Sequence, residues 1–243
     1  MTAAISTFCS EQLTQALDYH KQDQLDEAIN IYDCILENHP DHEYTLHAKG
    51  IALAQLGKYK PAMLLLNKAV TLAPENTTFL ASLGNCQRHL GLHDLALASF
   101  SKALEITPSI AAYINIGVLH YALKEYATAD DFFTKALKIH PNSVHALFNL
   151  ALCKLHSGYL QEAKLLLEKT IKIDGSHQGA LSQLGKIYLS EQALLLAKNC
   201  YHKLLNIQPR HAEATAQLGL IYLQMSDDKQ GLDLLEKAYK LDD

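Results

Sequence analysis

Residues 77–108, TTFLASLGNCQRHLGLHDLALASFSKALEITP, carry the pattern that decides the fold of this chain of 243 residues. Leu80 and Gly84 lie on one face of a predicted short helix, which Gly91 ends. A second helix with its own apolar stripe follows, and Pro108 closes the stretch. The stretch therefore predicts two short helices joined by a turn.

The same pattern recurs along the whole chain, and the interval from Pro74 to Pro108 is its typical spacing. A small residue in each first helix lets its partner helix approach closely, and a large residue in each second helix fills the space between them. The small residues are Ala16, Gly50, Gly84, Gly117, Ala151, Gly185 and Gly219. The large residues are Tyr32, Leu66, Phe100, Phe133, Leu167, Tyr201 and Leu235. One hairpin of this kind cannot bury its apolar face alone, so neighbouring hairpins must stack.

A helix–turn–helix repeat with this length and pattern resembles the tetratricopeptide repeat (TPR), although the Trp of the TPR signature is absent throughout. The resemblance covers roughly Cys9 to Asp243. It implies an all-α fold, an α-solenoid of about seven helix–turn–helix repeats that forms a right-handed superhelix and spans residues 1–243 as a single domain. The predicted repeats are residues 9–42, 43–76, 77–109, 110–143, 144–177, 178–211 and 212–243.

Short polar residues after the closing positions predict where the next first helix begins, because their side chains accept hydrogen bonds from free helix amides. These residues are Asp41, Asn76, Ser109, Asn142 and Ser176. Glycine suits the turn inside a hairpin and is present there in three repeats, as Gly57, Gly91 and Gly158. The other repeats carry Asp23, Lys124, Gln192 and Ser226, for which we expect a longer turn.

Composition excludes several classes of protein. Hydrophobic residues make up 49% of the chain, which excludes a disordered chain. A net charge of -5 without a strongly basic run argues against binding to nucleic acid or to an anionic membrane. No apolar stretch is long enough for membrane insertion, and the first residues lack the basic and apolar regions of a secretory signal. Five cysteines without paired spacing complete the prediction of a cytoplasmic protein with reduced thiols.

The main candidate site follows from the resemblance, because the first helices of TPR proteins line a concave groove. The residue two positions before the small residue is a carboxamide in the last four repeats, as Asn115, Asn149, Gln183 and Gln217. A carboxamide offers both a donor and an acceptor, so such a row can bind the backbone of an extended peptide. The row resembles the asparagine ladder in the TPR region of O-linked N-acetylglucosamine transferase. Exposure to solvent would also explain polar residues here, and the sequence leaves both interpretations open.

The predicted peptide-binding set also includes other residues of the first helices, namely Asn85, Arg88, Tyr121, His145, Phe148 and Lys186. In chaperone-binding TPR proteins two Asn and several cationic residues hold a C-terminal carboxylate. Asn85 and Asn115 match the two Asn, but the cationic positions are Ala81, His145 and Asn149 here, so we do not expect a chaperone tail as ligand. A further hypothesis is that groove binding changes near about pH 6–6.5 through the candidate histidines His47, His89, His145 and His156.

The sequence contains no nucleophile elbow, phosphate-binding loop, dinucleotide fingerprint or cluster of metal ligands, so we expect no enzyme activity, no cofactor and no metal. The preferred interpretation is a non-catalytic protein–protein interaction scaffold that binds an extended peptide or partner protein in its groove. The alternative is the N-terminal targeting or substrate-recruiting region of a larger enzyme, such as a glycosyltransferase or methyltransferase. The last repeat motivates this alternative, because no polar helix follows to cover Leu232, Leu235 and Tyr239. The same apolar surface predicts a homo-oligomer joined through the C-terminal helix.

Overall fold

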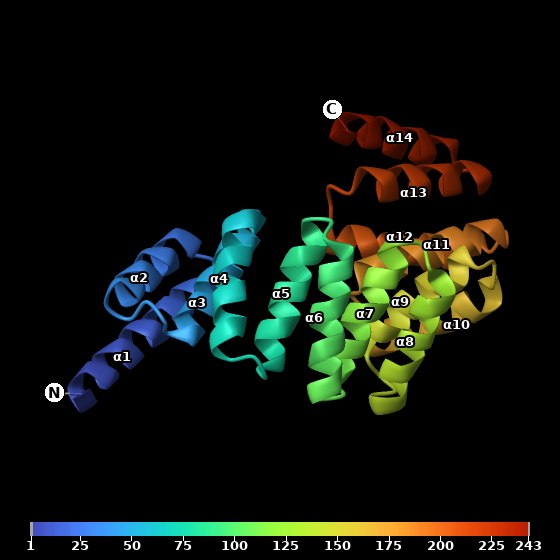
Figure 1. Ribbon diagram of the computed structural model, residues 1–243. Helices are drawn as coiled ribbons and strands as arrows, with labels where there is room; N and C mark the ends of the chain where they lie inside the picture. The colour runs from blue at the N-terminus through green and yellow to red at the C-terminus, as the bar shows by residue number, and fades with distance from the viewer. Residues whose placement is uncertain (1, 243) are drawn as a thin grey trace. The chain divides into compact units, whose positions relative to one another are not determined.

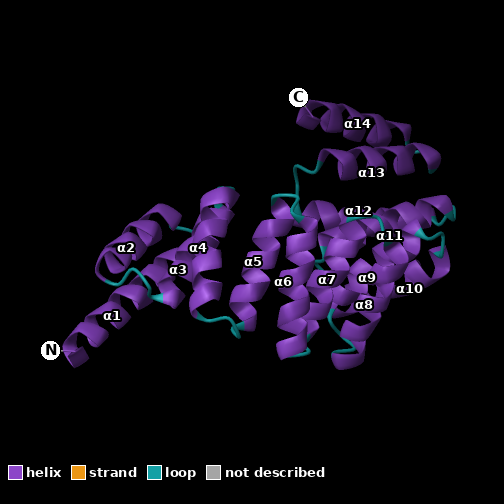
Figure 2. Ribbon diagram, viewed as in Figure 1, coloured by secondary structure: helices purple, strands orange, loops and turns teal. Residues whose placement is uncertain are grey.

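The computed structural model describes the chain from residue 2 to residue 242 and its side chains from residue 10 to residue 241. Within these residues the chain forms fourteen helices and no strand (Figures 1 and 2), which confirms the all-α prediction. The helices are α1 (Thr2–Lys21), α2 (Leu25–Asn38), α3 (Glu43–Gln55), α4 (Tyr59–Leu72), α5 (Thr77–His89), α6 (His93–Ile106), α7 (Ile110–Ala122), α8 (Tyr126–Ile139), α9 (Val144–His156), α10 (Leu160–Ile173), α11 (Gln178–Ser190), α12 (Leu194–Ile207), α13 (Ala212–Gln224) and α14 (Asp228–Asp242).

The chain divides into two compact units, with the border between Leu123 and Lys124. In the first compact unit each helix from α1 to α7 packs against the next, and α1, α3 and α5 each also contact the first helix that follows, which is α3, α5 or α7. In the second compact unit each helix from α8 to α14 packs against the next. Within each unit the chain is therefore a stack of antiparallel hairpins, as the recurring pattern predicts.

Close packing inside each hairpin depends on the small residue of its first helix. A Cβ atom built on Gly84 would lie 2.5 Å from Phe100 Cε1, and one built on Gly185 would lie 2.8 Å from Tyr201 Cζ. Phe100 and Tyr201 are themselves completely buried. The predicted pairing of a small with a large residue is confirmed, because no larger side chain fits at these points of closest approach.

The turn inside the hairpins has the same conformation in all seven. Gly57, Gly91 and Gly158 have φ of 72°, 74° and 81°. The four other residues at this position also have positive φ, between 59° and 63°, and they are Asp23, Lys124, Gln192 and Ser226. The expectation of a longer turn is therefore wrong, since a side chain at this position is accommodated by local strain instead of extra residues.

The helix starts agree in part with the sequence. Asn76 and Ser109 cap α5 and α7 as predicted, and Asn76 Oδ1 accepts from the amide of Thr78 at 3.1 Å. Elsewhere the cap is one residue later than Asp41, Asn142 and Ser176 and is His42, Ser143 or His177. The prediction considered only short oxygen-bearing side chains, whereas in His177 the ring atom Nδ1 accepts from the amide of Ala180 at 3.1 Å.

Candidate peptide-binding surface

The predicted site residues all lie on first helices, but they are divided between the two compact units. Asn85 and Arg88 lie on α5, and Asn115 and Tyr121 lie on α7. The second compact unit holds the others on α9, α11 and α13, and these are His145, Phe148, Asn149, Gln183, Lys186 and Gln217. The ladder as one continuous row of four carboxamides therefore stays a prediction.

A cavity of about 330 Å³ opens between α3 and α5, above α4. Leu66 and Cys86 are buried at its base, and Asn85 is half-buried at its side. The full set of lining residues is Ile51, Ala54, Gln55, Tyr59, Leu66, Ser82, Asn85, Cys86 and His89. An apolar base with a few convergent polar groups is the usual character of a binding pocket.

One wall of this cavity is fixed by two stacked rings. The Tyr59 and His89 rings are nearly parallel, at 4°, with centroids 4.7 Å apart. Cys86 Sγ donates a hydrogen bond to the carbonyl of Tyr59 at 3.1 Å and so ties α5 to the start of α4. Because these contacts hold Tyr59 and His89 in place, the cavity is preformed.

Three charged or titratable residues lie at this cavity or on the helices that line it, and they are Arg88, His89 and His47. Arg88 Nη2 lies 3.1 Å from His89 Nε2. Burial, followed by the charge of Arg88, lowers the pKa of His89. His47 contacts Ser82 Oγ at 2.9 Å through Nε2 and stacks on Phe79, and burial lowers its pKa to about 4. The hypothesis of a change near pH 6–6.5 is therefore wrong for His47, which is neutral in that range.

In the second compact unit, Phe148 forms a contact between first helices. A Cβ atom on Gly179 would lie 2.7 Å from Phe148 Cζ, and the ring of His177 lies 4.5 Å from that of Phe148. Phe148 also packs against the buried core of this unit. Its predicted role as a groove residue thus coincides with a structural role in joining α9 to α11.

The polar candidates of the second compact unit are partly engaged within the protein. Asn149 Nδ2 donates to the carbonyl of His145, one turn earlier on α9, at 2.8 Å. This bond uses one donor and leaves the rest of the carboxamide's capacity for a ligand. Lys186 forms an ion pair with Glu213 at 2.8 Å, which lowers the pKa of Glu213. Gln183 and Gln217 are half-buried at the same repeat position as Asn149.

Sequence reasoning missed Tyr59 and Gln55 as lining residues of the cavity. A signal for Tyr59 was present, because Tyr59 and Tyr126 are as far apart along the chain as His89 and His156. The Tyr126 and His156 rings stack in the same way, at 4.5 Å and 4°. Paired recurrence of two residue types at one spacing could therefore have indicated the contact before the structure did.

Metal-ligating side chains are not grouped in the described residues, and the cysteines there are free. Among residues 10–241 no three His, Cys, Asp or Glu side chains are grouped so as to hold a metal ion. Four cysteines in this range are free thiols, and burial raises the pKa of Cys153 to about 12 and that of Cys200 to about 11. The side chain of Cys9 lies outside the described residues. No helix in the described part of the chain has the length and apolar character needed to cross a membrane.

Comparisons with known proteins point to one family. Models described as tetratricopeptide repeats match residues 13–77, 47–109, 110–143 and 144–177. Human tetratricopeptide repeat protein 13 is 27% identical to this chain over 152 residues, which are 60% of this chain but only 18% of that protein. The chain thus spans less than a fifth of this curated relative.

Solved structures share the fold at low sequence identity. In the crystal structure of the APC/C hetero-tetramer Cut9–Hcn1, the matching chain has a TM-score of 0.75 and 16% identity, with 93% of this chain and 45% of that chain covered. YrrB, described as a TPR protein with an unusual peptide-binding site, has a TM-score of 0.58 and 22% identity, with 72% of this chain and 91% of that chain covered. At such identities the likeness shows the α-solenoid fold alone.

Proposed function

This chain belongs to the tetratricopeptide repeat family, and from that premise we propose that it is a non-catalytic interaction scaffold whose first helices bind an extended peptide segment of a partner protein. TPR proteins are generally protein-interaction scaffolds. The finer part of the proposal, a peptide held along the first helices, rests on the geometry of this chain.

The cavity between α3 and α5 carries the proposal. Its volume of about 330 Å³ suits one or two amino-acid side chains more than a drug-sized ligand. Leu66 and Cys86 supply an apolar base for a ligand side chain, while Asn85 supplies a carboxamide for the peptide backbone beside it. A peptide strand with apolar side chains at intervals matches this combination of groups.

The carboxamides of the second compact unit extend the proposal. Asn149, Gln183 and Gln217 occupy one repeat position on three successive first helices, and each is half-buried. Hydrogen bonds from such a row to a peptide backbone depend little on the peptide's side chains. Within the second compact unit we therefore expect the carboxamides to give affinity for a peptide backbone, and within the first compact unit we expect the cavity to give a preference for particular side chains.

Selection from a random peptide library on the immobilised chain tests this function. Peptides that bind the wild type are measured again on Asn85→Ala and Asn149→Ala variants. Loss of hydrogen bonds to one carboxamide is expected to weaken binding about tenfold. The matched control is Asn67→Ala on the exposed face of α4, which should leave the affinity unchanged.

Two results would contradict this function. Selected peptides that bind all three variants as tightly as the wild type would remove the carboxamides from the site. Failure to select any peptide, with a folded chain on the support, would remove peptide binding itself. Circular dichroism of each variant separates lost binding from lost folding.

We prefer this function to the targeting region of a larger enzyme. Human tetratricopeptide repeat protein 13, which is similar to this chain, is named for its repeats. The chain covers only 18% of human tetratricopeptide repeat protein 13. This coverage is compatible with both functions, because a scaffold and a targeting region can both be parts of longer proteins.

A further inference from the structure

The cavity between α3 and α5 lies in a basic segment of a chain that is acidic overall. The whole chain has a net charge of -5, whereas residues 43–89, from the start of α3 to the end of α5, contain five basic and two acidic residues. The two acidic residues are Glu43, which begins α3, and Glu75, in the loop before α5. His89 of the cavity wall lies at the opposite end of α5. The basic residues are Lys49, Lys58, Lys60, Lys68 and Arg88.

Three of these basic residues flank the two stacked rings of the cavity wall. Lys58 and Lys60 stand on either side of Tyr59 in the sequence and are exposed, and Arg88 directly precedes His89. The other two basic residues form ion pairs with aspartates. Positive charge beside this wall favours an acidic ligand over a basic one.

The side chain of Arg88 is fixed against the cavity wall. Its Nη2 donates to His89 Nε2 at 3.1 Å, because a guanidinium can only donate hydrogen bonds. His89 is therefore neutral with its ring proton on Nδ1, and its lowered pKa agrees with this state. Because His89 lines the cavity, the guanidinium lies one hydrogen bond away from the lining. That bond uses one of the five N–H donors of a guanidinium, whose planar fork matches a carboxylate.

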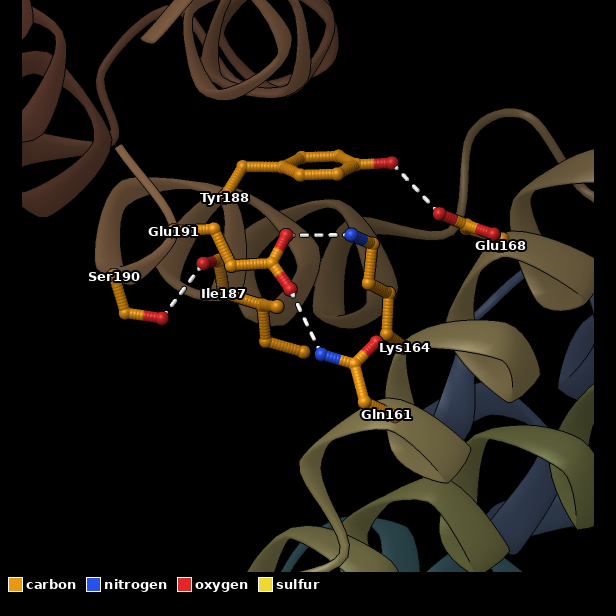
Figure 3. A network of polar contacts seen from close by, with 7 residues as sticks. All are labelled: Gln161, Lys164, Glu168, Ile187, Tyr188, Ser190 and Glu191. Atoms are coloured by element: carbon orange, nitrogen blue, oxygen red, sulfur yellow. Dashed lines mark hydrogen bonds and ion pairs between the residues drawn. The ribbon is translucent and has the colours of Figure 1, made fainter. Parts of the chain in front are cut away.

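The equivalent place in the second compact unit holds different residues. Leu155 stands at the repeat position of Ala54, a lining residue of the cavity, and packs against the buried core of its own unit. Ser190 stands at the repeat position of His89, and its hydroxyl donates to the carbonyl of Ile187 on the same helix at 2.7 Å (Figure 3). The fold therefore accepts a leucine at the position of Ala54, which supplies a substitution that fills the cavity.

We propose that the segment bound at this cavity carries a large apolar side chain with an acidic residue within about three residues of it. The apolar side chain enters the cavity onto Leu66 and Cys86, and the carboxylate of the acidic residue binds the Arg88 guanidinium. The short interval follows because an extended chain advances about 3.3 Å per residue. This inference rests on the proposed function and narrows its ligand to an acidic and apolar segment of the partner protein.

Selection from a random peptide library with both peptide ends fused, so that no free carboxyl terminus is offered, gives a first test. Peptides that bind the wild type are expected to be enriched in Asp or Glu close to Leu, Ile, Met or Phe. On Arg88→Gln the acidic enrichment should disappear, whereas the apolar enrichment should remain. The matched control is Arg210→Gln, which removes the other arginine of the chain at an exposed place in the second compact unit and should select like the wild type.

A charge exchange tests the Arg88 contact directly. One selected peptide is synthesised with capped ends, together with a copy in which Lys replaces the acidic residue. The wild type should bind the acidic peptide about tenfold more tightly than the Lys peptide in fluorescence anisotropy. Arg88→Glu should reverse this order, and its binding of the Lys peptide would show that the variant is folded. Preference of Arg88→Glu for the acidic peptide would overturn the proposal.

Filling the cavity tests the apolar part of the ligand. Ala54→Leu is expected to weaken binding of the same acidic peptide about tenfold, because the leucine occupies the space of the peptide's apolar side chain. Ala98→Leu adds the same side chain at an exposed place on α6 and should leave binding unchanged. Circular dichroism and thermal unfolding of both variants separate lost binding from lost folding.

The outcomes distinguish this inference from the function on which it rests. Peptides that bind the wild type without acidic enrichment, or that bind Arg88→Gln equally well, would overturn the inference and leave peptide binding in place. Equal binding to the wild type and a folded Ala54→Leu variant would put the apolar side chain outside the cavity and would also overturn it. Failure to select any peptide on the folded chain would remove the proposed function and this inference together.

Discussion

Tyr32 and Tyr201 fill the same place in two hairpins, but their hydroxyl groups have different surroundings. The Tyr32 hydroxyl lies 3.3 Å from His20 Nδ1, and His20 Nε2 lies 2.8 Å from Gln55 Oε1. The Tyr201 hydroxyl is buried and has no hydrogen-bond partner among the described residues. Leu189 stands at the repeat position of His20. Burial raises the pKa of both phenols, so both hydroxyls keep their protons.

Removing the two hydroxyl groups should therefore have opposite effects. Tyr32→Phe is expected to lower the free energy of unfolding by about 1 kcal/mol, because it breaks a hydrogen bond. Tyr201→Phe is expected to leave it unchanged or raise it by up to about 1 kcal/mol, because it removes an unpaired buried polar group. Urea denaturation of both variants measures the difference. An equal loss of stability in both would show that the Tyr201 hydroxyl has a partner.

The left-handed turns give a second prediction at the scale of single residues. Gln192 has φ of 59°, which strains any residue with a Cβ atom, so Gln192→Gly should stabilise the chain by about 0.5–1 kcal/mol. Gly57 has φ of 72° and open space around its Cα, so Gly57→Ala should destabilise it by about 1 kcal/mol. Thermal unfolding of the two variants measures whether each change in stability has the expected direction. Destabilisation by Gln192→Gly would mean that the Gln192 side chain makes a contact worth more than the strain.

Much of the residue-scale structure could be predicted, because each position of one repeat can be compared with the equivalent position in six others. The small and large residues of each hairpin were found in this way, and Gly84 and Phe100 are an example. The cap at His177 could not be found, because an imidazole competes poorly with oxygen in general preference and wins here only through its geometry. The stacking of Tyr59 on His89 was missed because each position was compared by residue class and single periodicity, which shows the face that a residue occupies. The paired recurrence of Tyr and His, which would have indicated the contact, was not considered.

Between elements, His47 joins α3 to α5 and makes that contact sensitive to acid. The folded pKa of about 4 lies below the unfolded value near 6.5, so the unfolded chain binds a proton more readily. The contribution of neutral His47 to the stability of the fold is complete above about pH 6.5 and is lost as the pH falls towards 4. Between pH 8 and pH 5 the wild type should lose about 2 kcal/mol through this group.

The variant His47→Gln separates this contribution from that of the other histidines. Glutamine can still form a hydrogen bond with Ser82 but does not titrate. The free energy of unfolding of the wild type, relative to that of the variant, should therefore fall by about 2 kcal/mol on going from pH 8 to pH 5. Urea denaturation at the two pH values gives the comparison. A difference that does not change with pH would show that His47 is protonated equally in both states.

At the scale of the whole molecule, sequence and structure agree on the number and order of helices among residues 2–242, whereas the single solenoid stays a prediction. The repeat predicts one solenoid, because every hairpin carries the same apolar pattern. The structure places the border of two compact units inside the turn of the fourth hairpin, at Leu123 and Lys124. The periodic pattern could not predict a border there, since it shows only what the hairpins have in common. It contains little information on how strongly one hairpin packs against the next.

The prediction of a single solenoid can be tested by perturbing one unit and observing the other. In a solenoid each hairpin is stabilised by its neighbours, so a destabilised hairpin weakens those beyond it. Gly84→Ala brings a Cβ atom within 2.5 Å of Phe100 and should cost about 1–3 kcal/mol in the first compact unit. If the solenoid is continuous, hydrogen exchange should quicken in α8 to α10 as well as in α5 to α7.

Gln192→Gly in the same experiment should slow exchange in the second compact unit and, through the same coupling, in α7. Exchange confined to the altered unit in both variants would mean that the chain is two independently stable bodies, and the peptide-binding row would then be two shorter sites.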